Sequence, residues 1–221
     1  MIEISKNSKK YPQFVRDLQN YPSSLFFSKE PDICYEKNIV FIGSRNMSPY
    51  GRDVCKEIVP RICNLGFNVV SGMADGIDSY CHRLAMKSGS QTIGILGYGF
   101  NYLNSRSYKN SVTKKLSQEI AENGKSFIVS PFSNNTFPSR ETFLERNKIL
   151  AAFAPITVVI EAASRSGTFS TVNAAIMLNK KVFAVPGSIF SYNSIGCHEL
   201  IKEGCLVLTS VDDILVNLSN L

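Results

Sequence analysis

The chain has 221 residues, 44% of them hydrophobic and 19% charged, and its formal net charge is +6. This balance is typical of a folded domain with a sizeable core and excludes a fibrous or disordered chain, while the excess of lysine and arginine favours an anionic partner. No apolar run reaches 18 residues and no basic-then-apolar leader opens the chain, so we expect no membrane span, no secretory signal and a cytoplasmic protein.

The chain divides into a lead-in and one domain. Residues 1–37, which contain three prolines, are expected to form an extended lead-in segment with one short helix, and residues 38–221 a single domain. In that domain, short β-branched runs alternate with amphipathic stretches. The predicted strands are 38–43, 67–72, 91–97, 126–130, 157–162, 181–187 and 205–208, and the predicted helices are 50–65, 77–88, 111–123, 141–153, 168–179, 196–203 and 211–219.

The predicted strands are apolar almost throughout, and each is followed by a helix. This pattern is typical of a parallel sheet that is covered on both faces. The predicted fold class is therefore α/β: an extended Rossmann-like, doubly wound, mostly parallel sheet with helices on both faces.

The strand-to-helix turns of such a sheet hold its ligands, because they meet at the carboxyl edge. Arg45 follows two small residues after the strand 38–43, and its guanidinium suits a phosphate. The glycine-containing turn SGMADGID follows the next strand, and 166–168 (SGT) precede a helix whose free N–H groups can receive an anion. Three cations lie close together near the helix 141–153, although they are equally compatible with a solvated helix face: Arg140, Arg146 and Lys148.

Two polar residues are expected to be structural. His82 lies four residues after Asp78 on one helix face, which favours an Asp–His hydrogen bond over catalysis. Asn147 lies on the stripe of its helix that faces the sheet. Because a buried amide needs partners, we expect it to fasten a neighbouring loop.

Several enzyme and cofactor classes lack their motifs here. The sequence has no P-loop, no nucleophile elbow, and no complete G-x-G-x-x-G with a suitable acid downstream. The six cysteines form no C-x-x-C pair, and the spacing of Cys197, His198 and Cys205 fits no zinc pattern. We therefore expect no cofactor and no metal.

Six segments in fixed order resemble the core of the DNA-processing protein A family (DprA, also called Smf). They are FIGSRNMSPYG, VVSGMADGID, TIGILGYG, RNKILAA, VVIEAASRSGTFSTVNAA and VFAVPGSIFSYNSIGCHELIKEGC. The stretch 11–27 is also similar to the segment that leads into that core, so the resemblance covers about residues 11 to 210. Several motifs in order are far more specific than any one of them.

The resemblance implies an extended Rossmann fold that binds single-stranded DNA in a basic pocket at the strand ends. It also implies a role in DNA uptake and natural transformation, a partnership with the recombinase RecA, a homodimer, and no enzymatic activity. Matched motif by motif, it implies these DNA- or phosphate-binding residues: Gly43, Ser44, Arg45, Gly72, Gly76, Arg140, Arg146, Asn147, Lys148, Arg165, Ser166, Gly167 and Thr168. Turn positions make Tyr98, Phe100 and Phe169 candidates for base stacking.

The sequence also departs from the family. Members usually have Lys or Arg where this chain has Asp75, and a carboxylate beside a phosphate costs about 1 kcal/mol or more. We therefore expect weaker DNA binding or a shifted DNA path. The length also leaves no room for the accessory N-terminal helical domain or the C-terminal winged-helix-like domain that many members carry.

Two alternatives stay open. One is a nucleotide-binding or nucleotide-processing protein of the wider lysine-decarboxylase-like Rossmann superfamily. The turn of those hydrolases holds a catalytic glutamate where this chain has Ser170 and Thr171, which leaves nucleotide sensing. The other is a dimeric scaffold with a vestigial pocket.

Overall fold

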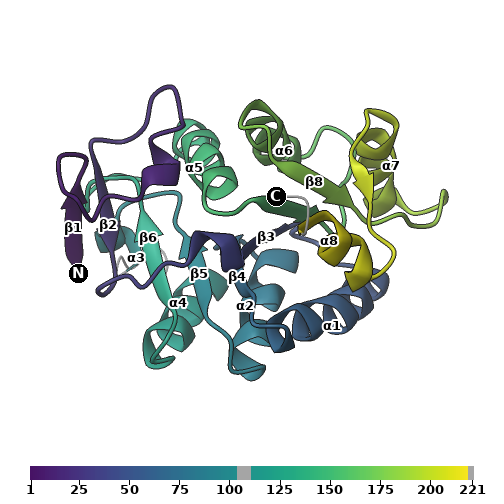
Figure 1. Cartoon of the computed structure of the whole chain (residues 1–221), viewed down its shortest axis with the longest axis horizontal. Coiled ribbons are helices and arrows are strands. Elements are labelled where there is room, and N and C mark those ends of the chain that lie inside the picture. Colours follow the sequence, from purple (N-terminus) through teal and green to yellow (C-terminus); the bar gives the residue numbers. More distant parts are fainter. Residues whose placement is uncertain (104–110, 219–221) are drawn as a thin grey trace.

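The computed structural model describes residues 1–103 and 111–218, and within these ranges one nine-stranded sheet runs through the molecule (Figure 1). Its strands are β1 (Ile2–Ser5), β2 (Ser24–Phe27), β3 (Asn38–Ile42), β4 (Asn68–Gly72), β5 (Thr92–Ile95), β6 (Phe127–Ser130), β7 (Ile156–Val159), β8 (Lys181–Ala184) and β9 (Leu206–Val207). The helices are α1 (Pro49–Asn64), α2 (Ile77–Lys87), α3 (Phe100–Leu103), α4 (Val112–Glu122), α5 (Arg140–Ala152), α6 (Thr168–Met177), α7 (Ile195–Lys202) and α8 (Val211–Leu218).

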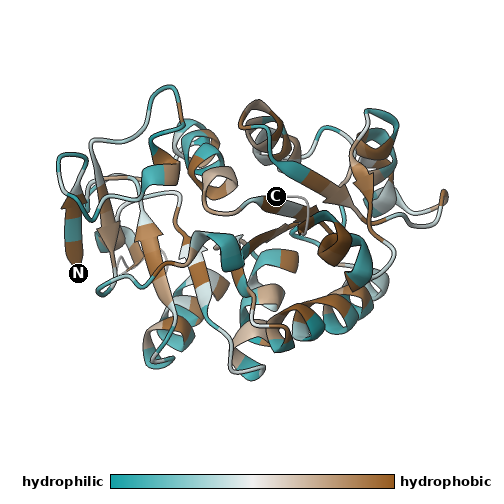
Figure 2. Cartoon of the chain, viewed as in Figure 1, coloured by the Kyte–Doolittle hydropathy of each residue, from teal (hydrophilic) through white to brown (hydrophobic). Residues whose placement is uncertain are grey.

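The central strands are buried on both faces, as their near-continuous apolar sequences predict. In β3, Ile39 and Phe41 pack with α1, α2 and α8, whereas Val40 and Ile42 face α5, α6 and α7. Figure 2 agrees with this arrangement: the strands are largely brown, whereas brown and teal residues alternate along the helices. The predicted doubly wound α/β fold is confirmed.

The strand order is β1–β2–β6–β5–β4–β3–β7–β8–β9. Strands β3 to β9 are parallel, whereas β2 pairs antiparallel with both β6 and β1. The chain leaves β3 toward β4, β5 and β6, then returns to place β7 on the other side of β3. The β3–β7 junction is therefore the topological switch point, where a doubly wound sheet forms its ligand crevice at the carboxyl edge.

The lead-in differs most from expectation. Besides short 3₁₀ turns at Gln13–Val15 and Tyr35–Lys37, it contains β1 and β2, which the sequence did not predict. Strand β2 pairs with β6 and buries Leu25 and Phe27 completely. Each of these strands has four residues, which is too few for an alternating pattern to be recognised in the sequence. Their β conformation therefore depends on pairing with the rest of the sheet.

The other boundaries agree closely with the predicted ones. The short helix α3 was not predicted, and the last position of the predicted helix 211–219 lies outside the described residues. Across 1–103 and 111–218, the structure contains no helix with the length and apolar character needed to cross a membrane.

Candidate functional site

A cavity of about 600 Å³ lies at the carboxyl ends of β3, β4 and β7, at the switch point. We call it the arginine cavity, because its lining includes Arg45, Arg140, Arg146 and Arg165. Ten of the thirteen candidate residues line it: Gly43, Ser44, Arg45, Arg140, Arg146, Asn147, Arg165, Ser166, Gly167 and Thr168. Asp78 is the one carboxylate among the described lining residues, so the cavity is strongly cationic.

Two buried side chains of opposite charge, Arg146 and Asp78, lie in the lining of the cavity. Arg146 is 5% exposed and Asp78 is 6% exposed. The Nη1 of Arg146 donates to the carbonyl of Ile95 at 2.7 Å, whereas its Nε has no partner among the described residues. Burial raises the pKa of Asp78 to about 6, and the guanidinium of Arg146 opposes that rise. Gly72 does not line the cavity; a side chain there would overlap both charged groups, so glycine makes room for them.

Gly76 also lies outside the lining, and it supports the loop that carries Arg45. Its φ is +77°, and a Cβ at this position would overlap the carbonyl oxygens of Ser44 and Arg45. The N–H of Ile77, at the start of α2, donates to the Ser44 carbonyl at 3.1 Å. The start of α2 therefore fixes the β3–α1 loop by direct backbone contact.

Glu161, which the sequence analysis did not single out, holds the far end of the same loop. It follows β7, is 1% exposed, and accepts hydrogen bonds from the N–H of Ser48 at 3.0 Å and from the Ser48 hydroxyl. Ser48 is the N-cap of α1. A carboxylate thus occupies the amino end of α1, where it interacts favourably with the helix dipole and excludes a phosphate. An acid directly after an apolar strand, as in VVIEA, is the signal that identifies it.

The start of α6 faces the arginine cavity and is open to an anion. Its N-cap, Gly167, provides no side-chain cap, and the N–H groups of Phe169 and Ser170 donate to the carbonyls of Ser166 and Gly167. The N–H of Thr168, the first residue of the helix, has no acceptor among the described residues and can receive an anion. Arg165 has a φ of 54°, a left-handed conformation that costs a non-glycine residue roughly 1 kcal/mol. The Oγ of Ser166 is buried without a hydrogen-bond partner among the described residues.

Asn147 fastens this loop, as predicted. Its Nδ2 donates to the Ser170 hydroxyl at 2.6 Å and to the Gly167 carbonyl at 3.4 Å. The amide is half-buried and lies on α5, so it joins α5 to the turn before α6. The function of Asn147 is therefore at least partly to position the residues around it.

A second cavity of about 450 Å³ adjoins the first and is also lined by Arg45 and Arg146. Asp75 lines this cavity and not the arginine cavity, so we call it the Asp75 cavity. Phe143 borders both cavities, and the Cζ atoms of Arg45 and Arg146 lie 5.8 and 5.7 Å from its ring centroid. The sequence analysis did not single out Phe143.

None of the three predicted stacking aromatics lines the arginine cavity. Tyr98 borders the Asp75 cavity but is 2% exposed. Phe100 and Phe169 are partly buried against core clusters and line neither cavity.

His82 is structural, but the predicted Asp–His hydrogen bond is wrong. Its Nδ1 lies 2.6 Å from the Thr92 hydroxyl and its Nε2 lies 2.8 Å from the Gly72 carbonyl. Burial lowers the pKa of His82 to about 4, so the ring is neutral near pH 7. Its Nε2–H then donates to Gly72 and its Nδ1 accepts from Thr92. The side chain of His82 therefore reaches into the sheet, away from the carboxylate of Asp78.

The family follows from comparison with known proteins. The family described as DNA recombination-mediator protein A matches residues 3–219. The chain belongs to this family.

Named relatives agree with that assignment. The chain is 32% identical over 215 residues to Protein Smf of Escherichia coli, covering 97% of this chain but 56% of the relative. It superposes on DNA processing protein A of Streptococcus pneumoniae with a TM-score of 0.83 at 29% identity, covering 97% and 73% of the two chains. For the Helicobacter pylori protein the TM-score is 0.82 at 23% identity, covering 96% and 94%, which shows the shared fold. The chain thus spans little more than half of the E. coli relative.

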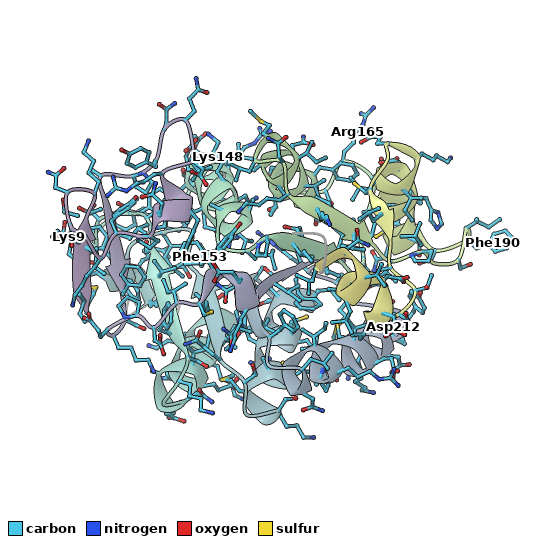
Figure 3. All side chains as sticks on the ribbon, viewed as in Figure 1. Lys9, Lys148, Phe153, Arg165, Phe190 and Asp212 are labelled. Carbon is cyan, nitrogen blue, oxygen red and sulfur yellow. The ribbon has the colours of Figure 1, made fainter. Side chains whose placement is uncertain are left out.

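Among the cationic residues that the family motifs assigned to DNA binding, Lys148 is the one that lines neither cavity. Its side chain is 49% exposed and pairs with Glu145 at 2.7 Å on the surface of α5. Figure 3 shows Lys148 and Arg165 near the same upper edge of the molecule, Lys148 by α5 and Arg165 on the side of α7. Contact between Lys148 and DNA stays a prediction.

Across the described ranges 1–103 and 111–218, no three His, Cys, Asp or Glu side chains are arranged to hold a metal ion. His198 instead lies beside the backbone of Gly187, with its Nε2 3.1 Å from the carbonyl oxygen.

Proposed function

We propose that this protein binds single-stranded DNA through the arginine cavity. The observation that carries the proposal is the grouping of four arginines around the uncapped start of α6, with one buried carboxylate in the lining. Guanidinium forks and free helix N–H groups are the donors that phosphates prefer. The Helicobacter pylori relative, whose solved structure addresses its single-stranded DNA binding mode, supports the same ligand class.

We also propose that the protein acts without catalysis. Ser170 and Thr171 stand where the related nucleotide hydrolases carry their glutamate. The Ser170 hydroxyl accepts from Asn147 and lies 2.8 Å from the carbonyl of Gly167, while Thr171 is buried. These contacts support a structural role for both hydroxyl residues.

The cellular role that we propose is protection of incoming single strands during DNA uptake and natural transformation, and loading of RecA onto them. The family description, recombination mediator, supports this role. Adding the protein should speed RecA filament formation on strands that are coated with single-stranded DNA-binding protein. Unchanged filament formation, with DNA binding intact, would contradict the loading role alone.

Salt-dependent binding tests the DNA proposal. Fluorescence anisotropy of a labelled oligothymidylate is measured across a salt series for the wild type, Arg45→Ala and Arg165→Ala. Each phosphate contact contributes roughly 0.7 to the slope of log K against log salt, so each variant should bind more weakly and lose about 0.7 from the slope. Lys9→Ala is the matched control, because it removes one exposed positive charge far from the cavity (Figure 3).

The same titration separates DNA from a small nucleotide. A DNA-binding cavity should prefer oligonucleotides over mononucleotides, with affinity that rises with length. If mononucleotides compete for the cavity as well as oligonucleotides do, the result would support the nucleotide-sensing alternative and contradict the DNA proposal. Equal losses in Lys9→Ala and Arg45→Ala would also count against the cavity, because they would indicate general charge attraction.

We further propose a homodimer that forms at the β9 end of the sheet. Strand β9 is an edge strand, and its Leu206 and Val207 are 38% and 42% exposed. The nearby β8–α7 loop exposes Ile189 and Phe190, and Phe190 projects from the right edge in Figure 3. Exposed apolar side chains beside an open strand edge favour association. Val207→Asp should yield a monomer in sedimentation, whereas Phe137→Asp, an exposed residue before α5, should not.

A further inference from the structure

The Asp75 cavity combines groups that a phosphate site would not. It shares Arg45, Arg146 and Phe143 with the arginine cavity, yet it adds a carboxylate. Asp75 is exposed, and no described residue donates a hydrogen bond to its side chain or pairs with it. An unpaired carboxylate repels the DNA backbone and attracts neutral groups that carry N–H donors.

Two hydroxyl groups of this cavity form hydrogen bonds within the protein. The Ser111 hydroxyl accepts from the N–H of Lys114 at 3.1 Å, as the N-cap of α4. The Thr113 hydroxyl donates to the carbonyl of Met73 at 2.8 Å. Arginines donate only. The carboxylate of Asp75 is therefore the strongest acceptor that the described lining presents to a ligand.

The four DNA bases differ in how they meet a carboxylate. Its two oxygens each accept a hydrogen bond, so it matches two adjacent N–H donors on one edge. Guanine offers this pair, N1–H and the N2 amino group. Adenine and cytosine place an acceptor nitrogen beside their amino group, and thymine places N3–H between two carbonyl oxygens. Each of these three bases would bring an acceptor against one carboxylate oxygen.

We propose that the Asp75 cavity binds a guanine base of the strand whose phosphates occupy the arginine cavity. The inference rests on the proposed function and adds base selectivity to it. Arg45 and Phe143 border both cavities, so one nucleotide can place its phosphate in one cavity and its base in the other. Asp75 then selects the base and does not bind the backbone.

Short oligonucleotides that differ at one base test this selectivity. Competition anisotropy compares oligothymidylates with one central guanine, one central hypoxanthine, or thymine throughout. Hypoxanthine keeps N1–H but lacks the amino group, so it removes one charge-assisted hydrogen bond. The wild type should prefer guanine to hypoxanthine by roughly tenfold or more, and Asp75→Asn should abolish that preference.

A matched control variant and the other possible outcomes distinguish a failure of this inference from a failure of the proposed function. Glu145→Gln changes the charge by the same amount on an exposed residue outside both cavities, and it should preserve the guanine preference. Equal wild-type affinity for guanine and hypoxanthine oligonucleotides, with binding retained, would overturn the inference alone. If Asp75→Asn tightened binding to all three oligonucleotides equally, Asp75 would act only by repelling phosphate, which would also overturn it. Loss of binding to every oligonucleotide in the wild type would overturn the proposed function as well.

Discussion

Replacing Glu161 by glutamine tests whether this carboxylate holds the β3–α1 loop. Glutamine has nearly the same shape, so the change removes the charge and one acceptor without opening a cavity. The Ser48 N–H and hydroxyl both donate to Glu161, at a position that is 1% exposed. After the substitution, the amide oxygen can accept only one of these hydrogen bonds, and the Ser48 hydroxyl must rotate to accept from the amide NH₂.

The expected loss follows from these contacts. A hydrogen bond to a charged group contributes about 1.5–3 kcal/mol, and a carboxylate at a helix amino end contributes about 0.3–1 kcal/mol more. We therefore expect the free energy of unfolding to fall by about 2–3 kcal/mol. For a domain of this size, each kcal/mol lowers Tm by roughly 2–4 °C, so Tm should fall by about 4–12 °C.

Thermal unfolding followed by circular dichroism measures the change. Glu145→Gln is the control: its exposed ion pair with Lys148 should contribute less than about 0.5 kcal/mol. Because Glu161 holds the loop that carries Arg45, Glu161→Gln should also weaken binding of oligothymidylate, whereas the control should not. A Tm within 2 °C of the control would refute the reasoning, since it would mean that Ser48 finds other partners.

Three further predictions concern pH, backbone and charge. The pKa of His82 is lowered to about 4, so its contribution to the free energy of unfolding falls as the pH drops from about 6.5 to 4. The pKa of Asp78 is raised to about 6, so its contribution to the free energy of unfolding rises as the pH drops from about 6 to 4. Each shift corresponds to roughly 3 kcal/mol, so the two nearly cancel in the wild type. In urea unfolding between pH 6.5 and 4, Asp78→Asn should become less stable relative to the wild type as the pH falls, and His82→Gln should become more stable relative to it. If the free energy of unfolding of the variants and the wild type changed in parallel with pH, these pKa shifts would be contradicted. Gly76→Ala should destabilise by about 2 kcal/mol or more, because its positive φ and the adjacent carbonyls exclude a side chain; a change below 0.5 kcal/mol in the same assay would show that the loop moves freely. Arg165→Asn should retain or raise Tm, because asparagine tolerates φ near 54°, yet weaken DNA binding; unchanged anisotropy would remove Arg165 from the interface.

Much of the candidate site follows from local sequence because its residues come directly after strands. Gly43 to Arg45 follow β3, and Arg165 to Thr168 follow β7. Once the strands are known to be parallel, their carboxyl ends must meet at one edge. The same reasoning fails for Lys148, since position along α5 does not say whether a side chain reaches the cavity or, as here, pairs with Glu145 on the surface.

The sequence by itself determined the alternation of seven strands with helices, the order of the motifs and the cationic turns. These features depend on residue periodicity and on neighbours close in the chain, which are readable without coordinates. Only the tertiary structure decided that β1 and β2 join the sheet, that His82 bonds to Thr92 and not to Asp78, and that Asp75 borders a separate cavity. Each of these depends on the direction in which a side chain or strand meets a partner far away in sequence, and no local pattern encodes that direction. The acid in SGMADGID thus lies in a cationic region, but it faces a different cavity from the one where the phosphates are expected.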